Sequence, residues 1–185
     1  MQFMCSLIVV ALAQFAAVCQ TGPVPGLSVF ARSRYCANAP TVKAGTFLDG
    51  RDLLSERTNH DPQRAPEVVT VCVPHTQVYL IMTLGIHISG NIVQSLLENA
   101  ALYVLNLIVR GGDGPLHNGM FNFPGMNDVT LQVWNANNHQ TTYGVLGGAI
   151  GALHDWMSNN AYGSVSFGIY DGVNQVGNGV VNGAG

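Results

Sequence analysis

Charged side chains are scarce in this chain, and cations are scarcer than acids. Lysine and arginine together number 7 of 185 residues, and aspartate and glutamate number 10. Beyond position 67 the only cation is Arg110, against five acidic residues. A domain with so few cations cannot neutralise the phosphates of a nucleic acid or of an anionic membrane. We therefore expect neither of these as a partner.

Cysteine is also scarce, with four residues in the whole chain. Cys5 and Cys19 fall in the N-terminal leader described below, which leaves Cys36 and Cys72 as an even pair. In an oxidising compartment such a pair predicts one disulfide; the alternative is two buried thiols. There is no CxxC spacing and no paired histidine motif, so we expect neither a metal site nor another cofactor.

Long hydrophobic runs are absent as well. The apolar run at residues 7–18 is too short to span a bilayer, but it has the length of a signal-peptide core. Small residues at Ala17 and Cys19 predict cleavage after Cys19. The alternative is a lipoprotein signal that lipidates Cys19, and the bulky Val18 argues against it. No later apolar stretch reaches spanning length without interruption, so we expect residues 20–185 to be secreted as a soluble protein without a membrane partner.

The mature chain divides into two parts by pattern. Residues 20–66 contain most of the charge and several prolines with weak periodicity, which predicts an irregular arm or a pro-segment tethered by the disulfide. Residues 67–185 are long enough for one domain with its own core. This domain has two helical stripes, at residues 89–100 and at 141–157, where Thr141 or Thr142 can cap the second helix. The predicted strands are 68–73, 78–84, 103–109, 117–123, 129–135, 164–170 and 176–181.

The order of these elements repeats, and Asn118-Gly119 has a counterpart in Asn178-Gly179 at similar spacing. We interpret the domain as a tandem β-α-β-β repeat in which the second helix is the longer one. The fold class is therefore α+β, an antiparallel sheet covered by two helices, with pseudo-twofold symmetry.

Three motifs could support chemistry or close packing. His87 and His139 each fall between a strand and the following helix, and they could meet as an acid–base pair; the alternative is two ordinary loop histidines. The neighbours His154 and Asp155 point about 100° apart on a helix, which favours two solvent-facing polar residues. The second helix also contains four glycines, which indicate the close approach of another backbone. These are Gly144, Gly147, Gly148 and Gly151.

The remaining candidates are loop residues. Two predicted turns, at 111–117 and 171–175, could present side chains to a partner on a rigid scaffold. Trp134 precedes a run of amide side chains, as sugar sites do, although a polar loop beside a core tryptophan has the same pattern. The candidate binding residues in these segments are Gly112, Asp113, His117, Trp134, Asn137, His139, Asp171 and Asn174.

The stretch at 163–179, with its core FGIYDGVNQVG, resembles small secreted proteins of filamentous fungi. Many of these are effector candidates that act around plant cells. The resemblance implies a secreted virulence protein that binds an extracellular host protein, and we expect it to be non-enzymatic and to inhibit a target such as a protease. A cell-wall carbohydrate-binding protein and a small secreted hydrolase built on His87 and His139 are the alternatives.

Overall fold

The computed structural model describes residues 34–49 and 68–183. The predicted signal peptide, residues 1–19, lies outside the described residues, and so does the predicted arm except for 34–49. The predicted domain is described from residue 68 to residue 183.

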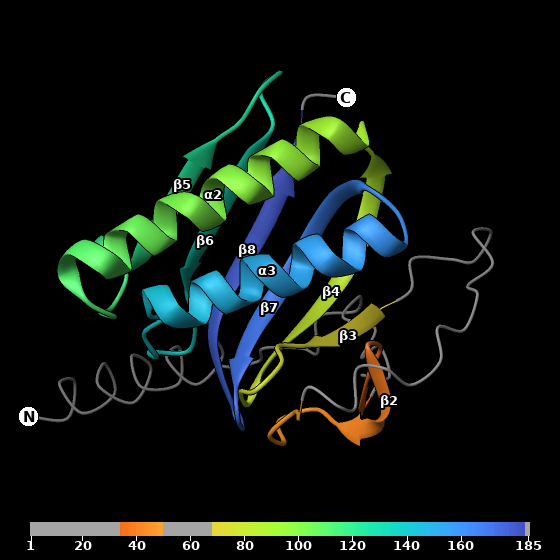
Figure 1. Ribbon diagram of the computed structural model, residues 1–185, viewed down its shortest axis with the longest axis vertical. Coiled ribbons are helices and arrows are strands. Elements are labelled where there is room, and N and C mark those ends of the chain that lie inside the picture. The colour runs from red at the N-terminus through yellow and green to blue at the C-terminus, as the bar shows by residue number, and fades with distance from the viewer. Residues whose placement is uncertain (1–33, 50–67, 184–185) are drawn as a thin grey trace, which may run out of the picture. The chain divides into compact units, whose positions relative to one another are not determined.

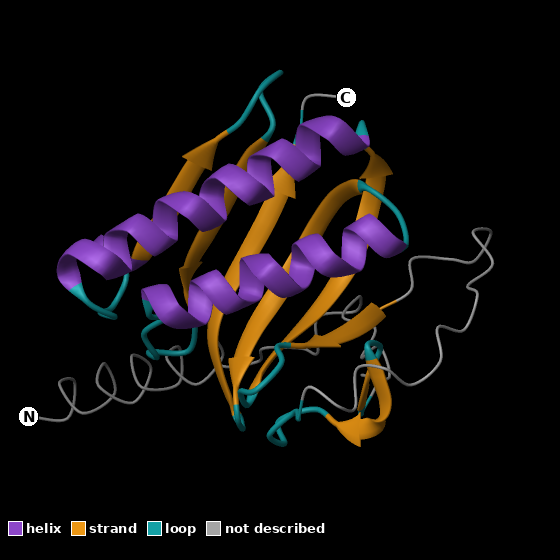
Figure 2. Ribbon diagram, in the orientation of Figure 1, coloured by secondary structure: helices purple, strands orange, loops and turns teal. Residues whose placement is uncertain are grey.

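A six-stranded antiparallel sheet forms the centre of the domain, with the strand order β3-β4-β7-β8-β6-β5. The helices α2 and α3 lie side by side across one face of this sheet (Figures 1 and 2). The α+β class predicted from the sequence is thereby confirmed. In chain order the elements are β3 (Val68–Cys72), β4 (Val78–His87), α2 (Gly90–Gly111), the 3-10 turn η2 (His117–Gly119), β5 (Met120–Pro124), β6 (Thr130–Asn135), α3 (Tyr143–Asn159), β7 (Gly163–Asp171) and β8 (Asn174–Asn182).

The two edges of the sheet are built in the same way: each edge is a hairpin that is followed in the chain by a helix. The hairpin β3–β4 lies on one side and the hairpin β5–β6 on the other, with β7 and β8 between them. Each outer hairpin is followed by a helix that covers the opposite half: α2 contacts β5 and β6, and α3 contacts β3 and β4. A twofold axis between β7 and β8 would exchange β3 with β5 and β4 with β6. This differs from the predicted repeat, which made residues 117–123 equivalent to 176–181.

The strand predicted at 103–109 is wrong, because these residues continue α2. Val104 and the β-branched residues after it suit a strand, but no glycine or proline interrupts the helix that begins at Gly90. Val104 is buried on the same stripe as Val93, Leu97 and Ala100. The first helix is therefore the longer one, contrary to the prediction. The β-α-β-β order holds for β6-α3-β7-β8, whereas a single strand separates α2 from β6.

With this extension, α2 is long and apolar enough to cross a membrane by length and composition, although helices buried in a protein core pass the same test. The expectation from the sequence concerned uninterrupted apolar stretches, and polar residues such as Glu98 and Asn106 interrupt this one. The helix packs on the sheet through one side, and 28% of its most apolar window is buried. Much of its apolar surface is therefore not used by the core.

The core lies between the helices and the facing side of the sheet. Alternate strand residues such as Leu80, Met82 and Leu131 meet the helix residues Leu97 and Leu153, and all five are buried. Removing a side chain of this size from water stabilises the fold by roughly 1.5–3 kcal/mol.

One glycine is required by this packing. A Cβ atom at Gly179 of β8 would occupy the space of the Phe167 ring on β7. The large ring and the missing side chain lie opposite each other in the strand register, so the two residues fill one site in the core.

Residues 34–49 form a second, two-stranded sheet of β1 (Tyr35–Cys36) and β2 (Ala39–Lys43), which is more regular than the predicted arm. The predicted disulfide between Cys36 and Cys72 is present and joins this hairpin to β3. The side chain of Asn38 adds two hydrogen bonds: its Nδ2 donates to the Cys72 carbonyl at 2.6 Å and its Oδ1 accepts from the Cys72 N–H at 3.1 Å. A small cluster that includes Leu48 and Ala39 is buried around the disulfide.

Candidate functional site

Three loops meet at one end of the sheet, where β6 and β7 end and β5 and β8 begin. We call residues 112–119, 136–142 and 171–174 the loop rim. The backbone N–H of Leu116 donates to the Thr141 carbonyl at 3.0 Å, and the N–H of Tyr143 donates to the Gly114 carbonyl at 2.9 Å. The N–H of Ala136 donates to the Val176 carbonyl at 3.1 Å. Hydrogen bonds therefore join the first loop to the second and the second loop to β8.

Asp113 in the first loop caps α3. Its Oδ1 accepts from the Gly144 N–H at 2.8 Å, and its Oδ2 accepts from the Thr142 hydroxyl at 3.3 Å. Thr142 Oγ1 in turn accepts from the Val145 N–H at 3.3 Å, so the predicted cap is confirmed. A carboxylate beside the first N–H groups of a helix is favoured by the helix dipole. Asp113 thus fixes the loop in place and is less free to bind a partner than its exposure indicates.

The second loop is fixed by Thr141, which is fully buried. Its N–H donates to Asn135 Oδ1 at 2.9 Å, and its hydroxyl donates to the Val176 carbonyl at 2.8 Å. At the surface, Asn137 Nδ2 donates to Gln175 Oε1 at 3.3 Å, which adds a side-chain contact between the second loop and β8.

The third loop is the turn between β7 and β8, and Val173 lies at its tip. Val173 is 94% exposed, the highest fraction among the large hydrophobic residues of the described ranges 34–49 and 68–183. Gly172 adopts a positive φ of 58°, and its N–H donates to the Gln77 carbonyl at 3.3 Å, which joins this turn to the β3–β4 turn. The Val173 side chain is therefore exposed to solvent on a turn that hydrogen bonds to the neighbouring turn of the sheet.

The structure brings seven of the eight candidate binding residues into the loop rim. Trp134 is the exception: it alternates with the buried Val133, so its side chain lies on the sheet face opposite the helices, in register with Met120 and Asn178. The tryptophan and the amide run that follows it therefore belong to different surfaces. The seven rim residues are Gly112, Asp113, His117, Asn137, His139, Asp171 and Asn174.

The histidine pair predicted as an acid–base site does not form. His87 pairs with Gly163 at the start of β7, whereas His139 follows β6 at the end where β7 finishes. The seven residues from Gly163 to Ile169 of β7 already span roughly 20 Å at about 3.3 Å per residue. Antiparallel strands place the two histidines at opposite ends of the sheet. The acid–base pair on which the hydrolase alternative was based is therefore not formed.

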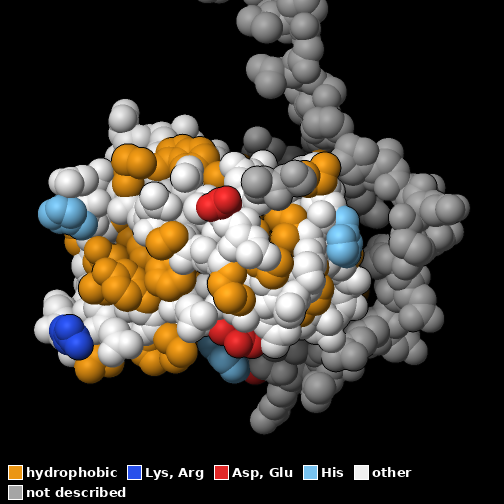
Figure 3. Space-filling view, turned by 90° about the horizontal axis from the view of Figure 1, so that it is seen from above, with side chains coloured by type: hydrophobic (Ala, Val, Ile, Leu, Met, Phe, Trp, Pro, Cys, Tyr) orange, Lys and Arg blue, Asp and Glu red, His pale blue; other side chains and the backbone are white. Residues whose placement is uncertain are grey.

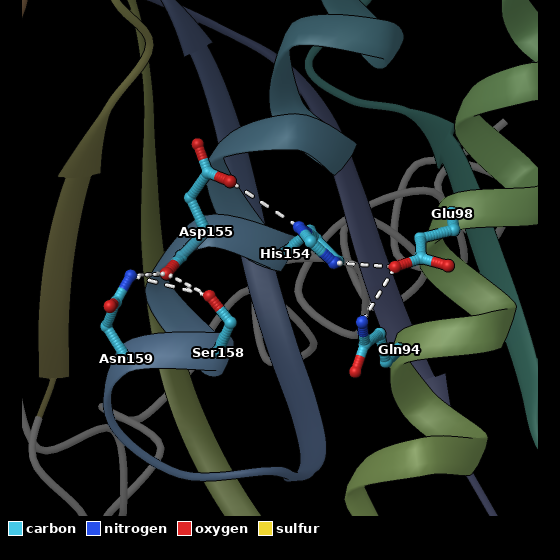
Figure 4. A network of polar contacts seen from close by, with 6 residues as sticks. All are labelled: Gln94, Glu98, His154, Asp155, Ser158 and Asn159. Atoms are coloured by element: carbon cyan, nitrogen blue, oxygen red, sulfur yellow. Dashed lines mark hydrogen bonds and ion pairs between the residues drawn. The ribbon is translucent and has the colours of Figure 1, made fainter.

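A different histidine contact is present between the helices (Figure 4). His154 of α3 lies with its Nδ1 3.4 Å from Asp155 Oδ1 and its Nε2 3.5 Å from Glu98 Oε1 of α2. Gln94 Nε2 also donates to Glu98 Oε1, at 2.8 Å. The interpretation of His154 and Asp155 as two solvent-facing residues is therefore wrong for His154, because its ring turns toward α2. Nothing near Asp155 in the sequence pointed to Glu98.

The surroundings of His154 do not add a nucleophile. The hydroxyl of Ser158 donates to the Asp155 carbonyl at 2.9 Å, away from the imidazole. Within residues 34–49 and 68–183, no group of three or more His, Cys, Asp or Glu side chains could hold a metal ion. The contact serves as a polar link between α2 and α3.

Three of the four helix glycines have a close neighbour. A Cβ at Gly144 would meet the Asp113 carboxylate, one at Gly147 would lie 3.5 Å from Val104 of α2, and one at Gly148 would lie 3.0 Å from Val73. Close packing within the chain thus accounts for Gly144 and Gly148, whereas the distance at Gly147 is an ordinary van der Waals contact that an alanine would accept. Gly151 has nothing within 4 Å of that position.

A groove of about 670 Å³ runs between α2 and the end of β5. Its apolar lining includes Leu102, Tyr103, Phe123 and Met126, and its polar lining includes Asn106. Figure 3 shows hydrophobic side chains gathered on this side of the domain with few charged groups among them. The sequence pattern did not indicate this surface, because residues 103–109 were predicted to form a strand and instead belong to α2.

No protein-family model, curated protein or solved structure matches this chain.

Proposed function

We propose that this protein is an extracellular, non-enzymatic effector that binds a host protein through the loop rim and inhibits it, with a protease as the expected class of target. The observation that carries the proposal is Val173, a nearly fully exposed apolar residue at the tip of a supported turn. The Cys36–Cys72 disulfide is of the kind that oxidising compartments sustain, which supports an extracellular site of action.

The loop rim suits a binding role because its loops are already ordered. Hydrogen bonds from buried Thr141 and from Asp113 hold the loops in one arrangement. A preorganised loop loses less conformational entropy when it binds, so more of the contact energy remains as affinity. Protein–protein interfaces combine an apolar anchor region at the centre with a polar rim. Val173 would be that anchor, with Asn174 and Asp171 beside it.

The experiment is an affinity capture from plant extracellular fluid with tagged residues 20–185. The test variant is Val173→Asp, and the matched control is Ile86→Asp, because Ile86 is also an exposed β-branched residue but lies at the other end of the sheet. We expect one protein to be retained by the wild type and by the control, and its recovery to fall at least about tenfold with Val173→Asp. Equal recovery with all three would contradict binding through the rim.

An activity assay then separates binding from inhibition. If the captured protein is a hydrolase, its turnover should fall as wild-type protein is added and should be unaffected by Val173→Asp. If the captured hydrolase keeps full activity in the presence of the wild-type protein, the proposed binding stands and the proposed inhibition is contradicted.

Trp134 favours a second candidate function, carbohydrate binding. Its exposed ring lies on the sheet face opposite the helices, with Gln132 two residues away on the same strand and Asn122 paired to Gln132 across the strands. Aromatic faces beside amide groups are suited to sugar rings. Retention on insoluble cell-wall glycan that is lost in Trp134→Ala, with an unchanged unfolding midpoint, would support this function. Retention that persists in the variant would exclude Trp134 as the sugar platform.

A further inference from the structure

The outer edges of the six-stranded sheet are β3 on one side and β5 on the other (Figure 1). A strand at an edge has backbone N–H and carbonyl groups that its single neighbour leaves unpaired. On β3, residues 34–49 bond to these groups. The Ala37 N–H donates to the Thr70 carbonyl at 2.5 Å, and the Asn38 side chain bonds to both the N–H and the carbonyl of Cys72. The β3 edge is therefore occupied by another part of the chain.

The β5 edge differs, because within residues 34–49 and 68–183 this strand pairs only with β6. Just after β5, the N–H of Gly125 donates to the Val129 carbonyl at 2.7 Å. Backbone groups alternate in direction along an antiparallel strand, so Phe123 and Phe121 also direct theirs toward β6. The intervening residues direct their backbone groups outward, and these are Met120, Asn122 and Pro124.

The outward groups of β5 are mostly acceptors. Pro124 has no N–H, and the N–H of Met120 already donates to the His117 carbonyl. The Asn122 N–H is therefore the one outward donor that β5 has left, against the three outward carbonyls. Two copies of this edge could form at most two hydrogen bonds with each other, one from each Asn122 N–H. An extended peptide has an N–H on every residue other than proline, so it could bond to all four outward groups.

The groove of about 670 Å³ lies beside this edge. Tyr103 and Asn106 line it from α2, and Phe123 and Met126 line it from β5 and the turn that follows. The Tyr103 and Phe123 rings contact each other, with their centroids 5.7 Å apart. Directly opposed residues of two antiparallel strands point their side chains to the same face of a sheet. In a strand added to β5, the residue opposite Phe123 would therefore point into the groove.

We propose that β5 is a strand-addition site, which binds an extended segment of a partner protein antiparallel to β5 with an apolar side chain in the groove opposite Phe123. The segment bonds to both backbone groups of Asn122 and donates one N–H to each of the Met120 and Pro124 carbonyls. The backbone bonds supply affinity, and the groove supplies selectivity for the apolar residue. The groove lies at the Pro124 end of β5, whereas the loop rim adjoins the Met120 end, so the two sites are separate.

Peptides test the backbone requirement. The probe is a fluorescein-labelled peptide selected on residues 20–185 from a random display library, and its affinity is measured by fluorescence polarisation. N-methylation then removes one peptide N–H at a time. We expect the affinity to fall by about tenfold at every second residue, whose N–H faces β5, and by less than about twofold at the residues between them. A library that yields no binder, or N-methylation without this alternation, would overturn the proposal.

Variants of the edge and of the groove test the protein side. Asn122→Pro removes the outward donor without touching the bonds to β6, as Pro124 already does, and should weaken binding of the probe by about tenfold. Asn122→Ala is the matched control, since it keeps the N–H, and should bind like the wild type. Met126→Asp places a charge in the groove and should also weaken binding. Val109→Asp, at an exposed position of α2 outside the groove lining, should not.

Circular dichroism and the unfolding midpoint verify that each variant is folded. Equal affinity of the wild type and a folded Asn122→Pro variant would contradict strand addition. Val173→Asp separates this site from the loop rim, because it should leave the affinity for the probe unchanged even if the rim proposal fails. Loss of probe binding in Val173→Asp would place the peptide on the rim and overturn the assignment to β5.

Sedimentation velocity tests a second copy of the chain as the competing occupant. We expect a monomer at the concentrations used for probe binding, because two β5 edges offer each other few donors. A dimer that is lost in Asn122→Pro and kept in Asn122→Ala would assign the edge to a second copy and overturn the proposal.

Discussion

The helices α2 and α3 occupy equivalent positions in the fold but use their residues differently. Each follows an outer hairpin, and each crosses to the other half of the sheet. The outer side of α3 includes Gly151 and the exposed Asp155, whereas α2 exposes Leu102 and Leu105. The fold uses one apolar side from each helix, and the exposed leucines of α2 lie outside the core.

The helices also begin differently. Thr142 and Asp113 both bond to N–H groups at the start of α3. At the start of α2, Ser89 makes no side-chain bond to the helix backbone, and its hydroxyl donates to Asn91 Oδ1 instead. The well-capped start of α3 lies in the loop rim, so the more firmly held helix end coincides with the proposed binding surface.

The largest difference should come from removing one leucine from each helix. Leu153 of α3 is fully buried, so Leu153→Ala should lower the free energy of unfolding by about 2–5 kcal/mol. Leu105→Ala on the exposed side of α2 should change it by less than about 0.5 kcal/mol. Guanidinium unfolding measures both. Similar losses at the two positions would mean that the exposed side of α2 contributes to the core.

The caps should differ by a smaller amount. Asp113→Ala removes two hydrogen bonds at the start of α3 and should lower the free energy of unfolding by about 1–2 kcal/mol. Ser89→Ala should change it by only a few tenths of a kcal/mol, because no capping bond is lost. Urea unfolding of the two variants, with Ser158→Ala as a surface control, makes this comparison. An equal effect of the two substitutions would contradict the role given to Asp113.

The glycines of α3 should respond with opposite signs. Gly151→Ala meets no neighbour and should raise the free energy of unfolding by about 0.5–1 kcal/mol, since alanine is the better helix former. Gly144→Ala should lower it, because the added Cβ displaces the Asp113 carboxylate. Thermal unfolding distinguishes the two by the direction of the shift. If Gly144→Ala were stabilising, the Asp113 cap would be dispensable.

The polar link between the helices should have the smallest effect. Glu98→Gln removes the charge beside His154, but Glu98 is half exposed, and water screens the interaction. The expected change in the free energy of unfolding is below about 0.5 kcal/mol. A larger loss in urea unfolding would show that the contact between Glu98 and His154 helps to hold α2 against α3.

The sequence predicted the parts of this fold that depend on local pattern. The capped helix α3, the strands on either side of it and the Cys36–Cys72 disulfide follow from spacing and composition. The conformation of residues 103–109 did not follow from the local pattern, because a short apolar run with Val104 and Ile108 suits a buried strand as well as a helix. Only the unbroken stripe that begins at Val93 decides between them.

The candidate surfaces were predictable to different degrees. Turn residues such as Asp171 were identified from the sequence, but their meeting in one rim depends on the antiparallel order of distant strands. The same order separates His87 from His139, which no local pattern revealed. The contact of His154 with Glu98 joins residues 56 positions apart and was therefore invisible along the chain.

The proposal that the loop rim is the binding surface is tested most directly by hydrogen–deuterium exchange of the mature chain with and without the captured partner. We predict that slowing of exchange is concentrated in residues 112–119, 136–142 and 171–174, and that the exchange of α2 is unchanged at equal protein concentration. Protection confined to α2 or to the central strands, with the rim exchanging at its free rate, would contradict the account.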